Sequence, residues 1–160
     1  MRVWREGLVA GLLGAAGVAI WFFVVDALAG TPLATPDMLG RAMLSVLGKG
    51  IALSTMGNVV AYTLFHLAAF IAVGCVVSWI VESSRVTPGA LVGLLLFFAV
   101  FEVGFYCLTL FLSQETAFGH LAWYQIGAAN LIAAAMMGRY LWREHPDLGT
   151  RINAALEGTR

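Results

Sequence analysis

The sequence is short of charged residues, prolines and cysteines. Only 11% of its 160 residues are charged, against roughly a quarter in ordinary soluble domains, so the chain is poorly suited to a surface that faces water. Its formal net charge is zero, so it has no basic field to attract nucleic acid, and nucleic-acid binding is excluded. The two cysteines, Cys75 and Cys107, lie inside apolar runs, where a thiol behaves as a small hydrophobe. A disulfide is therefore not expected.

The sequence also lacks catalytic and metal-binding motifs. It has no H-E-x-x-H, no G-x-S-x-G, no P-loop and no dinucleotide fingerprint. A haem held by His66 and His120 is unfavourable, because the two differ in predicted depth by about eight residues, or ~12 Å of helix. We therefore expect no enzyme and assign no cofactor. An acid–base pair of Glu102 and His66 is a minor alternative.

What the sequence has in abundance is apolar residues. They make up 61% of the chain, and the mean hydropathy is +0.88. Four apolar runs each reach the ~20 residues that a helix needs to cross a bilayer, namely 8–29, 59–81, 88–112 and 121–141. The sequence therefore predicts an all-α, polytopic integral membrane protein with a four-helix transmembrane domain over residues 1–145.

The first apolar run raises the question of a cleaved signal peptide. Arg2 and Arg5 precede it, and Ala27-Leu28-Ala29 resembles a cleavage site. However, the apolar stretch before Asp26 is longer than the ~7–15 residues of a signal core. We expect it to be retained as the first span.

The basic residues predict how the chain is oriented. Cytoplasmic loops retain an excess of Lys and Arg. With four spans, two basic residues, Arg41 and Lys49, fall on one side. Seven fall on the other: Arg2, Arg5, Arg85, Arg139, Arg143, Arg151 and Arg160. Both termini are therefore predicted to be cytoplasmic, in the inner (cytoplasmic) membrane.

Two segments lie outside the four runs. In the outer loop, residues 36–48 place apolar side chains on one helical face and Arg41, Ser45 and Lys49 on the other. This pattern favours a short amphipathic helix in the membrane surface, with packing under the bundle or re-entry into the membrane as the alternative. Residues 146–160 are expected to be a cytoplasmic tail, solvated or partly ordered.

Stripes of small residues predict where the helices meet, because they let two backbones approach closely. One stripe lies in the first run and comprises Gly7, Gly11, Ala15 and Ala19. The other lies in the fourth run and comprises Asn130, Ala134 and Gly138. These stripes either close the bundle or contact another protein. Ala10 is expected to face lipid.

Polar residues at membrane depth indicate function by default, since they are costly there. Glu102 falls near the middle of the third run, with His66 and Asn130 at a comparable depth and Tyr62 and Tyr106 further out. We take these five as a tentative ligand-binding pocket that opens outward. The alternative for Glu102 is a protonated carboxyl held by one hydrogen bond. Asp26 and His120 are expected to be solvated near the interface.

Two functions agree with this pattern. The first is a small non-catalytic subunit that packs against a larger membrane protein complex, such as a respiratory or photosynthetic assembly, with the lipid bilayer and other membrane subunits as partners. The alternative is a small carrier or sensor that binds a ligand, a proton or a quinone-like molecule in the outward-facing pocket.

Overall fold

The computed structural model describes residues 2–48, 53–87, 89–112 and 123–157. The side chains of residues 47, 97, 101, 102, 104–106, 108–112 and 123 are outside the description. Regular structure in the described residues is entirely helical. The helices are α1 (Arg2–Leu28), α2 (Ala34–Leu47), α3 (Thr55–Ser83), α4 (Ala90–Leu112), α5 (Trp123–Glu144) and α6 (Leu148–Glu157).

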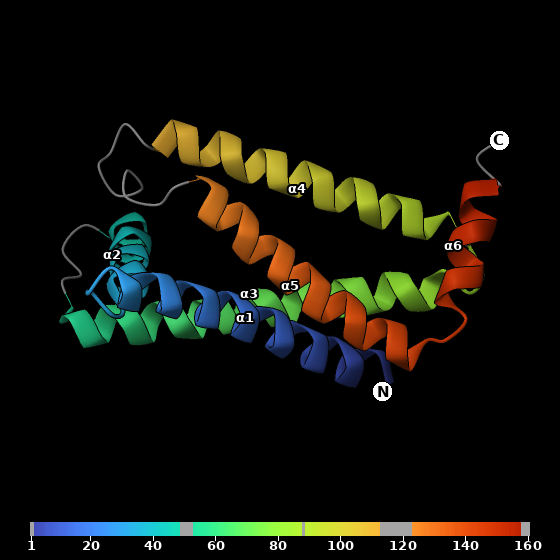
Figure 1. The fold of residues 1–160 in the computed structure, drawn as a ribbon, viewed down its shortest axis with the longest axis horizontal. Helices are drawn as coiled ribbons and strands as arrows, with labels where there is room; N and C mark the ends of the chain where they lie inside the picture. Colours follow the sequence, from blue (N-terminus) through green and yellow to red (C-terminus); the bar gives the residue numbers. More distant parts are fainter. Residues whose placement is uncertain (1, 49–52, 88, 113–122, 158–160) are drawn as a thin grey trace.

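The long helices α1, α3 and α5 pack side by side, while two short helices lie at opposite ends of this group (Figure 1). Helix α2 lies at the end where α1 finishes and α3 starts. Helix α6 lies at the other end, close to the N-terminus. Helix α4 contacts α3 and α6 at one end, while most of its visible length stands apart from α1 and α3 (Figure 1).

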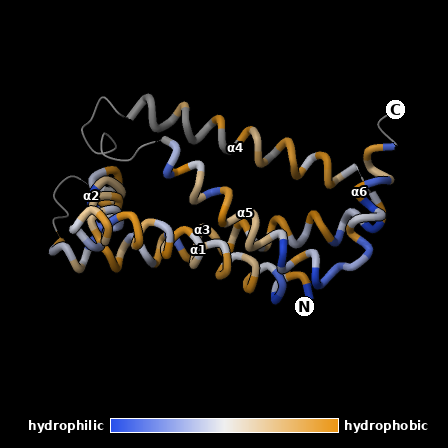
Figure 2. Tube along the Cα trace, in the orientation of Figure 1, coloured by the Kyte–Doolittle hydropathy of each residue, from blue (hydrophilic) through white to orange (hydrophobic). Residues whose placement is uncertain are grey.

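Two of the helices, α1 and α3, are long and apolar enough to cross a membrane. At 1.5 Å per residue, 27 and 29 residues extend well beyond the ~30 Å of a hydrocarbon core. Hydrophilic residues gather at the end that carries the N-terminus and α6, and apolar residues dominate the middle (Figure 2). That α4 and α5 also cross, giving four spans, stays a prediction.

Helices α1 and α3 each begin a few residues before the apolar runs predicted at 8–29 and 59–81. Helix α1 includes Arg2 and Glu6, which are joined one turn apart by an ion pair of 2.6 Å. Helix α3 begins after Ser54, whose Oγ accepts a hydrogen bond from the Gly57 backbone N–H at 3.2 Å. This N-cap satisfies one of the backbone donors that a helix start leaves unpaired.

A close contact between backbones joins α1 to α3. A Cβ added to Gly11 would lie 2.6 Å from the Ile71 Cα and would overlap the Phe70 carbonyl oxygen. From the other side, a Cβ on Gly74 would lie 2.6 Å from the Gly11 nitrogen and would overlap the Gly7 carbonyl oxygen. Only glycine permits this backbone contact. Gly74 therefore completes an interface that the first helix begins.

Helix α5 covers the neighbouring face of α1. Met137 and Leu141 join Ala10 and Val81 in one buried cluster, and Ala129 and Ala133 bury Val18 in a second cluster further along. Ala10 is completely buried. The expectation that Ala10 faces lipid is therefore wrong, because the side chains of α5 close over that face of α1.

The two short helices pack on the bundle ends. Helix α2 rests on the start of α3, where a Cβ on Gly40 would overlap the Asn58 carbonyl oxygen. The amphipathic helix predicted for 36–48 thus exists, with its Gly40 and Leu44 side buried. The segment expected to be a tail carries α6, whose Leu148 packs in the same cluster as Val81.

Candidate functional site

His66 is the centre of the predicted ligand pocket, and it is held by the chain itself. Its Nε2 lies 3.2 Å from the Ala15 carbonyl oxygen of α1. Because that oxygen can only accept, Nε2 carries the proton and donates it. The rings of Tyr62 and Phe70, one turn to either side, have centroids 5.5 and 4.7 Å from the imidazole. His66 thus helps to fasten α3 to α1.

The other predicted pocket residues are not gathered around His66 by the described contacts. Asn130 is half-buried on α5 and interacts within the chain. The side chains of Glu102 and Tyr106 lie outside the described residues. The structure brings His66 and Tyr62 together through their spacing on one helix. A shared site of Glu102 and His66 stays a prediction.

Only some residues of the two predicted small-residue stripes lie at helix contacts. Gly7, Gly11 and Ala15 are buried, whereas Ala19 is exposed. On α5, Ala134 is half-buried, and a Cβ on Gly138 would meet nothing within 4 Å. The buried stripe of α5 lies on its other side and comprises Ile126, Ala129, Ala133, Met137 and Leu141.

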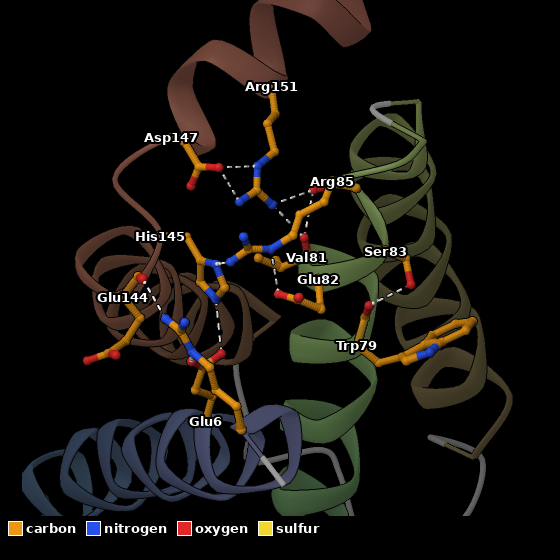
Figure 3. A network of polar contacts seen from close by, with 12 residues as sticks. Glu6, Trp79, Val81, Glu82, Ser83, Arg85, Glu144, His145, Asp147 and Arg151 are labelled. Atoms are coloured by element: carbon orange, nitrogen blue, oxygen red, sulfur yellow. Dashed lines mark hydrogen bonds and ion pairs between the residues drawn. The ribbon is translucent and has the colours of Figure 1, made fainter.

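The most connected group of polar side chains lies at the end of the bundle where α1 begins (Figure 3). His145, just past α5, is buried, and its Nε2 lies 2.9 Å from the Glu6 carboxylate of α1. Its Nδ1 faces the Arg85 guanidinium at 3.5 Å, and Arg85 also binds Glu82 at 2.8 Å. A neutral imidazole that donates to Glu6 and accepts from Arg85 satisfies both contacts.

Arg151 extends this network of polar side chains to α6. Its guanidinium donates to the Val81 carbonyl oxygen at 2.9 Å and to the Ser84 hydroxyl at 3.1 Å. The same group binds Asp147 at the start of α6 through Nε at 2.9 Å. Arg2 closes the far side by donating to the Glu144 carbonyl oxygen at 3.2 Å. The network therefore ties the ends of α1, α3, α5 and α6 together.

The charges in this network are mutually compensated. Burial opposes ionisation of Glu6, but hydrogen bonds from Arg2 and His145 outweigh it and hold the pKa of the Glu6 carboxyl below its usual range. The hydrogen bond from Arg151 likewise lowers the pKa of Asp147. Both carboxylates are therefore ionised at neutral pH and paired with arginine, which is the arrangement of a structural ion-pair network.

Polar contacts at the opposite end hold α2. The buried Asp26 carboxyl accepts hydrogen bonds from the Thr35 backbone N–H at 2.8 Å and from its hydroxyl at 2.7 Å. Asn58 of α3 donates to Asp37 at 2.8 Å. The expectation that Asp26 is solvated is therefore wrong, since α2 covers it. The feature of the sequence that could have indicated this burial is the position of Asp26, one turn from the end of a long apolar run.

Sequence reasoning missed Glu6, His145 and Arg151. Each of the three lies beside the end of an apolar run on the same predicted side. Charged residues are common at such positions, so little in the sequence distinguished these three. Within the described residues no group of three or more His, Cys, Asp and Glu side chains could hold a metal ion. Comparison with protein-family models, with curated proteins and with solved structures found no match. Function is accordingly argued from the chain's own residues.

Proposed function

We propose that this chain is a small non-catalytic integral membrane protein with four spans, which packs against a larger membrane protein assembly, for instance a respiratory or photosynthetic complex. The observation that carries the proposal is the exposure of α4. Between Leu95 and Val103 its described large side chains are exposed to between 38 and 70%, and they spread over more than half of the helix circumference.

This exposed part of α4 contrasts with the rest of the bundle. Leu95, Phe98 and Val100 lie about 60 to 160° apart around a helix with 3.6 residues per turn, so the exposed face that these side chains form is broad. Helices α1 and α5 each bury one continuous stripe instead. A broad exposed apolar face suits a surface on which helices of another subunit pack.

The polar groups support a structural role. In the described part of the chain, Glu6, Asp26, Asp37 and His145 are buried and bonded to side chains of neighbouring segments. Their hydrogen bonds are used to hold helix ends, so none of these four is presented to a substrate. His66 is engaged with the Ala15 carbonyl oxygen in the same way. Among the described side chains, no contact favours the carrier or sensor alternative.

A site-specific photocrosslinker tests for the partner. Benzoylphenylalanine placed at Val100 on α4 is expected to yield a discrete crosslinked protein band in native membranes. The same probe at Leu64 on α3, which is similarly exposed, serves as the matched control and is expected to give mainly lipid adducts. If Val100 also gives only lipid adducts, and the chain elutes alone in mild detergent, the subunit proposal fails.

Cysteine labelling tests the membrane placement separately. In a variant with Cys75 and Cys107 replaced by alanine, a cysteine at Ser45 is expected to react with an impermeant reagent on intact cells. A cysteine at Val86, which is 88% exposed in the loop between α3 and α4, should react only after lysis. Labelling of Val86 on intact cells would reverse the proposed orientation.

A further inference from the structure

His145 lies at the joint between α5 and α6, and its ring stands between two groups of opposite charge (Figure 3). The side chain is buried. On one side Nε2 lies 2.9 Å from the Glu6 carboxylate of α1. On the other side Nδ1 lies 3.5 Å from a guanidinium nitrogen of Arg85, which belongs to the connection between α3 and α4. The imidazole therefore links the α5–α6 joint both to α1 and to the α3–α4 connection.

The neutral form of the imidazole satisfies both of these contacts. A neutral ring has one N–H donor and one acceptor nitrogen, whereas a carboxylate can only accept and a guanidinium can only donate. The proton therefore lies on Nε2, toward Glu6, and Nδ1 accepts from Arg85. A second proton on Nδ1 would set two donors and two positive charges against each other. The contact to Glu6 would instead gain strength, because it would join opposite charges.

Arg85 has a second partner on its own side of the contact. Its Nε donates to the Glu82 carboxylate at 2.8 Å, and its side chain is already 43% exposed. It can therefore leave His145 without losing its ion pair or entering an apolar environment. His145 is buried and held by Glu6, so it cannot follow. Protonation of the ring thus breaks the contact to Arg85 and keeps the contact to Glu6.

Several charged groups from all the packed helix ends surround His145. They are Arg2 and Glu6 of α1, Glu82 of α3, Arg85 of the α3–α4 connection, the preceding residue Glu144 of α5, and Asp147 and Arg151 of α6 and its start. Burial opposes ionisation of Glu6, but hydrogen bonds from Arg2 and His145 hold the pKa of its carboxyl below the usual range. Histidine is the side chain whose ordinary charge change falls between about pH 5 and 8. Across that range Glu6 remains an anion that His145 can bind in either form.

The connection that Arg85 belongs to is also where α4 is attached to the rest of the chain. Helix α4 contacts α3 and α6 at this end, and most of its visible length stands apart from α1 and α3 (Figure 1). A second tie of the connection is the Ser84 hydroxyl, which accepts from Arg151 at 3.1 Å. Loss of the Arg85 contact leaves this tie in place but loosens the residues that follow it. The start of α4 is therefore sensitive to the charge of His145.

We propose that His145 is a proton-sensitive switch at the start of α4. The neutral ring holds Arg85 and, through it, the α3–α4 connection. Uptake of one proton at Nδ1 turns that nitrogen into a donor, so that Arg85 keeps its own charge, leaves the ring and pairs with Glu82 alone, while His145 stays on Glu6. The connection and the first turn of α4 then become free to move. This regulation goes beyond the packing role in the proposed function and requires no partner.

A fluorescent probe on the connection tests the switch in the purified full-length chain. In a variant with Cys75 and Cys107 replaced by alanine, the probe is attached to a cysteine at Val86, which is 88% exposed. Its anisotropy is expected to fall between a neutral sample at about pH 8 and an acidic sample at about pH 5. The same probe at Ser45 on α2 serves as the control and should show no such fall.

Variants assign the change to the contact between His145 and Arg85. His145→Gln keeps a polar side chain that does not titrate, so the fall at Val86 should be lost. His66→Gln, at a histidine held elsewhere on α3, should retain it. Arg85→Ala removes the contact at any pH, so its anisotropy in the neutral sample should already be as low as that of the parent in the acidic sample.

Nitrogen NMR of isotope-labelled histidine reports the state of the ring directly. In the neutral sample the His145 signals, identified by their absence in His145→Gln, should show a protonated Nε2 and an unprotonated Nδ1. If His145→Gln does not fold, the signals lost in His66→Gln and the anisotropy of Arg85→Ala still test the switch. A protonated Nδ1 in the neutral sample, a fall at Val86 that persists in His145→Gln, or an Arg85→Ala variant that behaves like the parent would each overturn it.

Discussion

Helices α1 and α4 are similar in the sequence and differ sharply in the structure. Both are long apolar segments, yet α1 buries a continuous stripe against α3 and α5, whereas the described large side chains of α4 between Leu95 and Val103 are all exposed. Helix α1 is held at three levels: by Glu6 at one end, by its glycines in the middle and by Asp26 at the other end. Apolar composition makes a helix compatible with lipid. Small residues, together with polar side chains that are paired at both ends, place α1 at the centre of the bundle.

The largest effect is expected at the glycine contact of α1. Gly11→Leu places a branched side chain where even a Cβ would overlap the Phe70 carbonyl oxygen of α3. We expect a loss of at least ~3 kcal/mol in the free energy of unfolding, because backbone atoms cannot move aside as side chains can. Thermal unfolding in detergent, followed by tryptophan fluorescence, measures it.

The matched control is Gly93→Leu on α4, where a Cβ would meet nothing within 4 Å. This change should leave the unfolding temperature equal or slightly higher, since glycine costs a helix interior roughly 0.5–1 kcal/mol relative to alanine. Equal damage at Gly11 and Gly93 would remove the distinction between the two helices.

The next effect is expected at the N-terminal end of α1. Glu6→Leu removes the acceptor of the buried His145 N–H and one partner of Arg2. Leaving a buried donor unpaired costs about 1–3 kcal/mol. Glu6→Gln keeps an acceptor oxygen and should cost clearly less. Equal unfolding temperatures for the two variants would show that the hydrogen bond to His145 does not stabilise the fold.

Glu6 also predicts a pH dependence. Its pKa is lowered from 4.5 in the folded chain, so its ionised form contributes stability that is fully present above pH 4.5. That contribution is lost as pH falls through the lowered value. We expect the unfolding temperature of the unmodified chain to fall below pH 4.5, and to fall less steeply in Glu6→Leu. Parallel profiles would contradict the assignment.

A smaller, local effect is expected at the C-terminal end of α1. Thr35→Val removes the hydroxyl that donates to the buried Asp26 carboxyl while keeping the side-chain shape. We expect a loss of about 1–2 kcal/mol, visible as faster amide hydrogen exchange in α2. Thr63→Val is the control, because its hydroxyl only bonds the Val59 carbonyl of its own helix. Unchanged exchange in α2 would show that Asp26 does not hold it.

The smallest contrast compares equal truncations on the two helices. Val18→Ala in the α1–α5 cluster should cost about 1 kcal/mol. Val100→Ala on the exposed α4 should cost less than ~0.5 kcal/mol in the isolated chain. Denaturant titration in micelles measures both. A larger loss at Val100 than at Val18 would mean that α4 is buried against something already present in the sample.

The candidate site was only partly accessible from sequence. The cost of polar groups at membrane depth drew attention to His66, but its partner in the structure is a backbone carbonyl of α1, and every residue carries one. Glu6 and His145 are 139 residues apart. Their pairing depends on how the first and fifth helices align, and no local pattern encodes that alignment.

By itself, the sequence determined the helical nature of the chain and the approximate helix bounds, because a long apolar segment can satisfy its backbone groups only within a helix. It also indicated Gly7 and Gly11 as places of close approach. The tertiary structure alone decided which face of each helix is buried. Residues such as Ala10, Ala19 and Gly138 are equally small and apolar, and only helix rotation separates the buried one from the exposed ones. That rotation is set by residues of distant segments, above all Gly74, Met137 and His145.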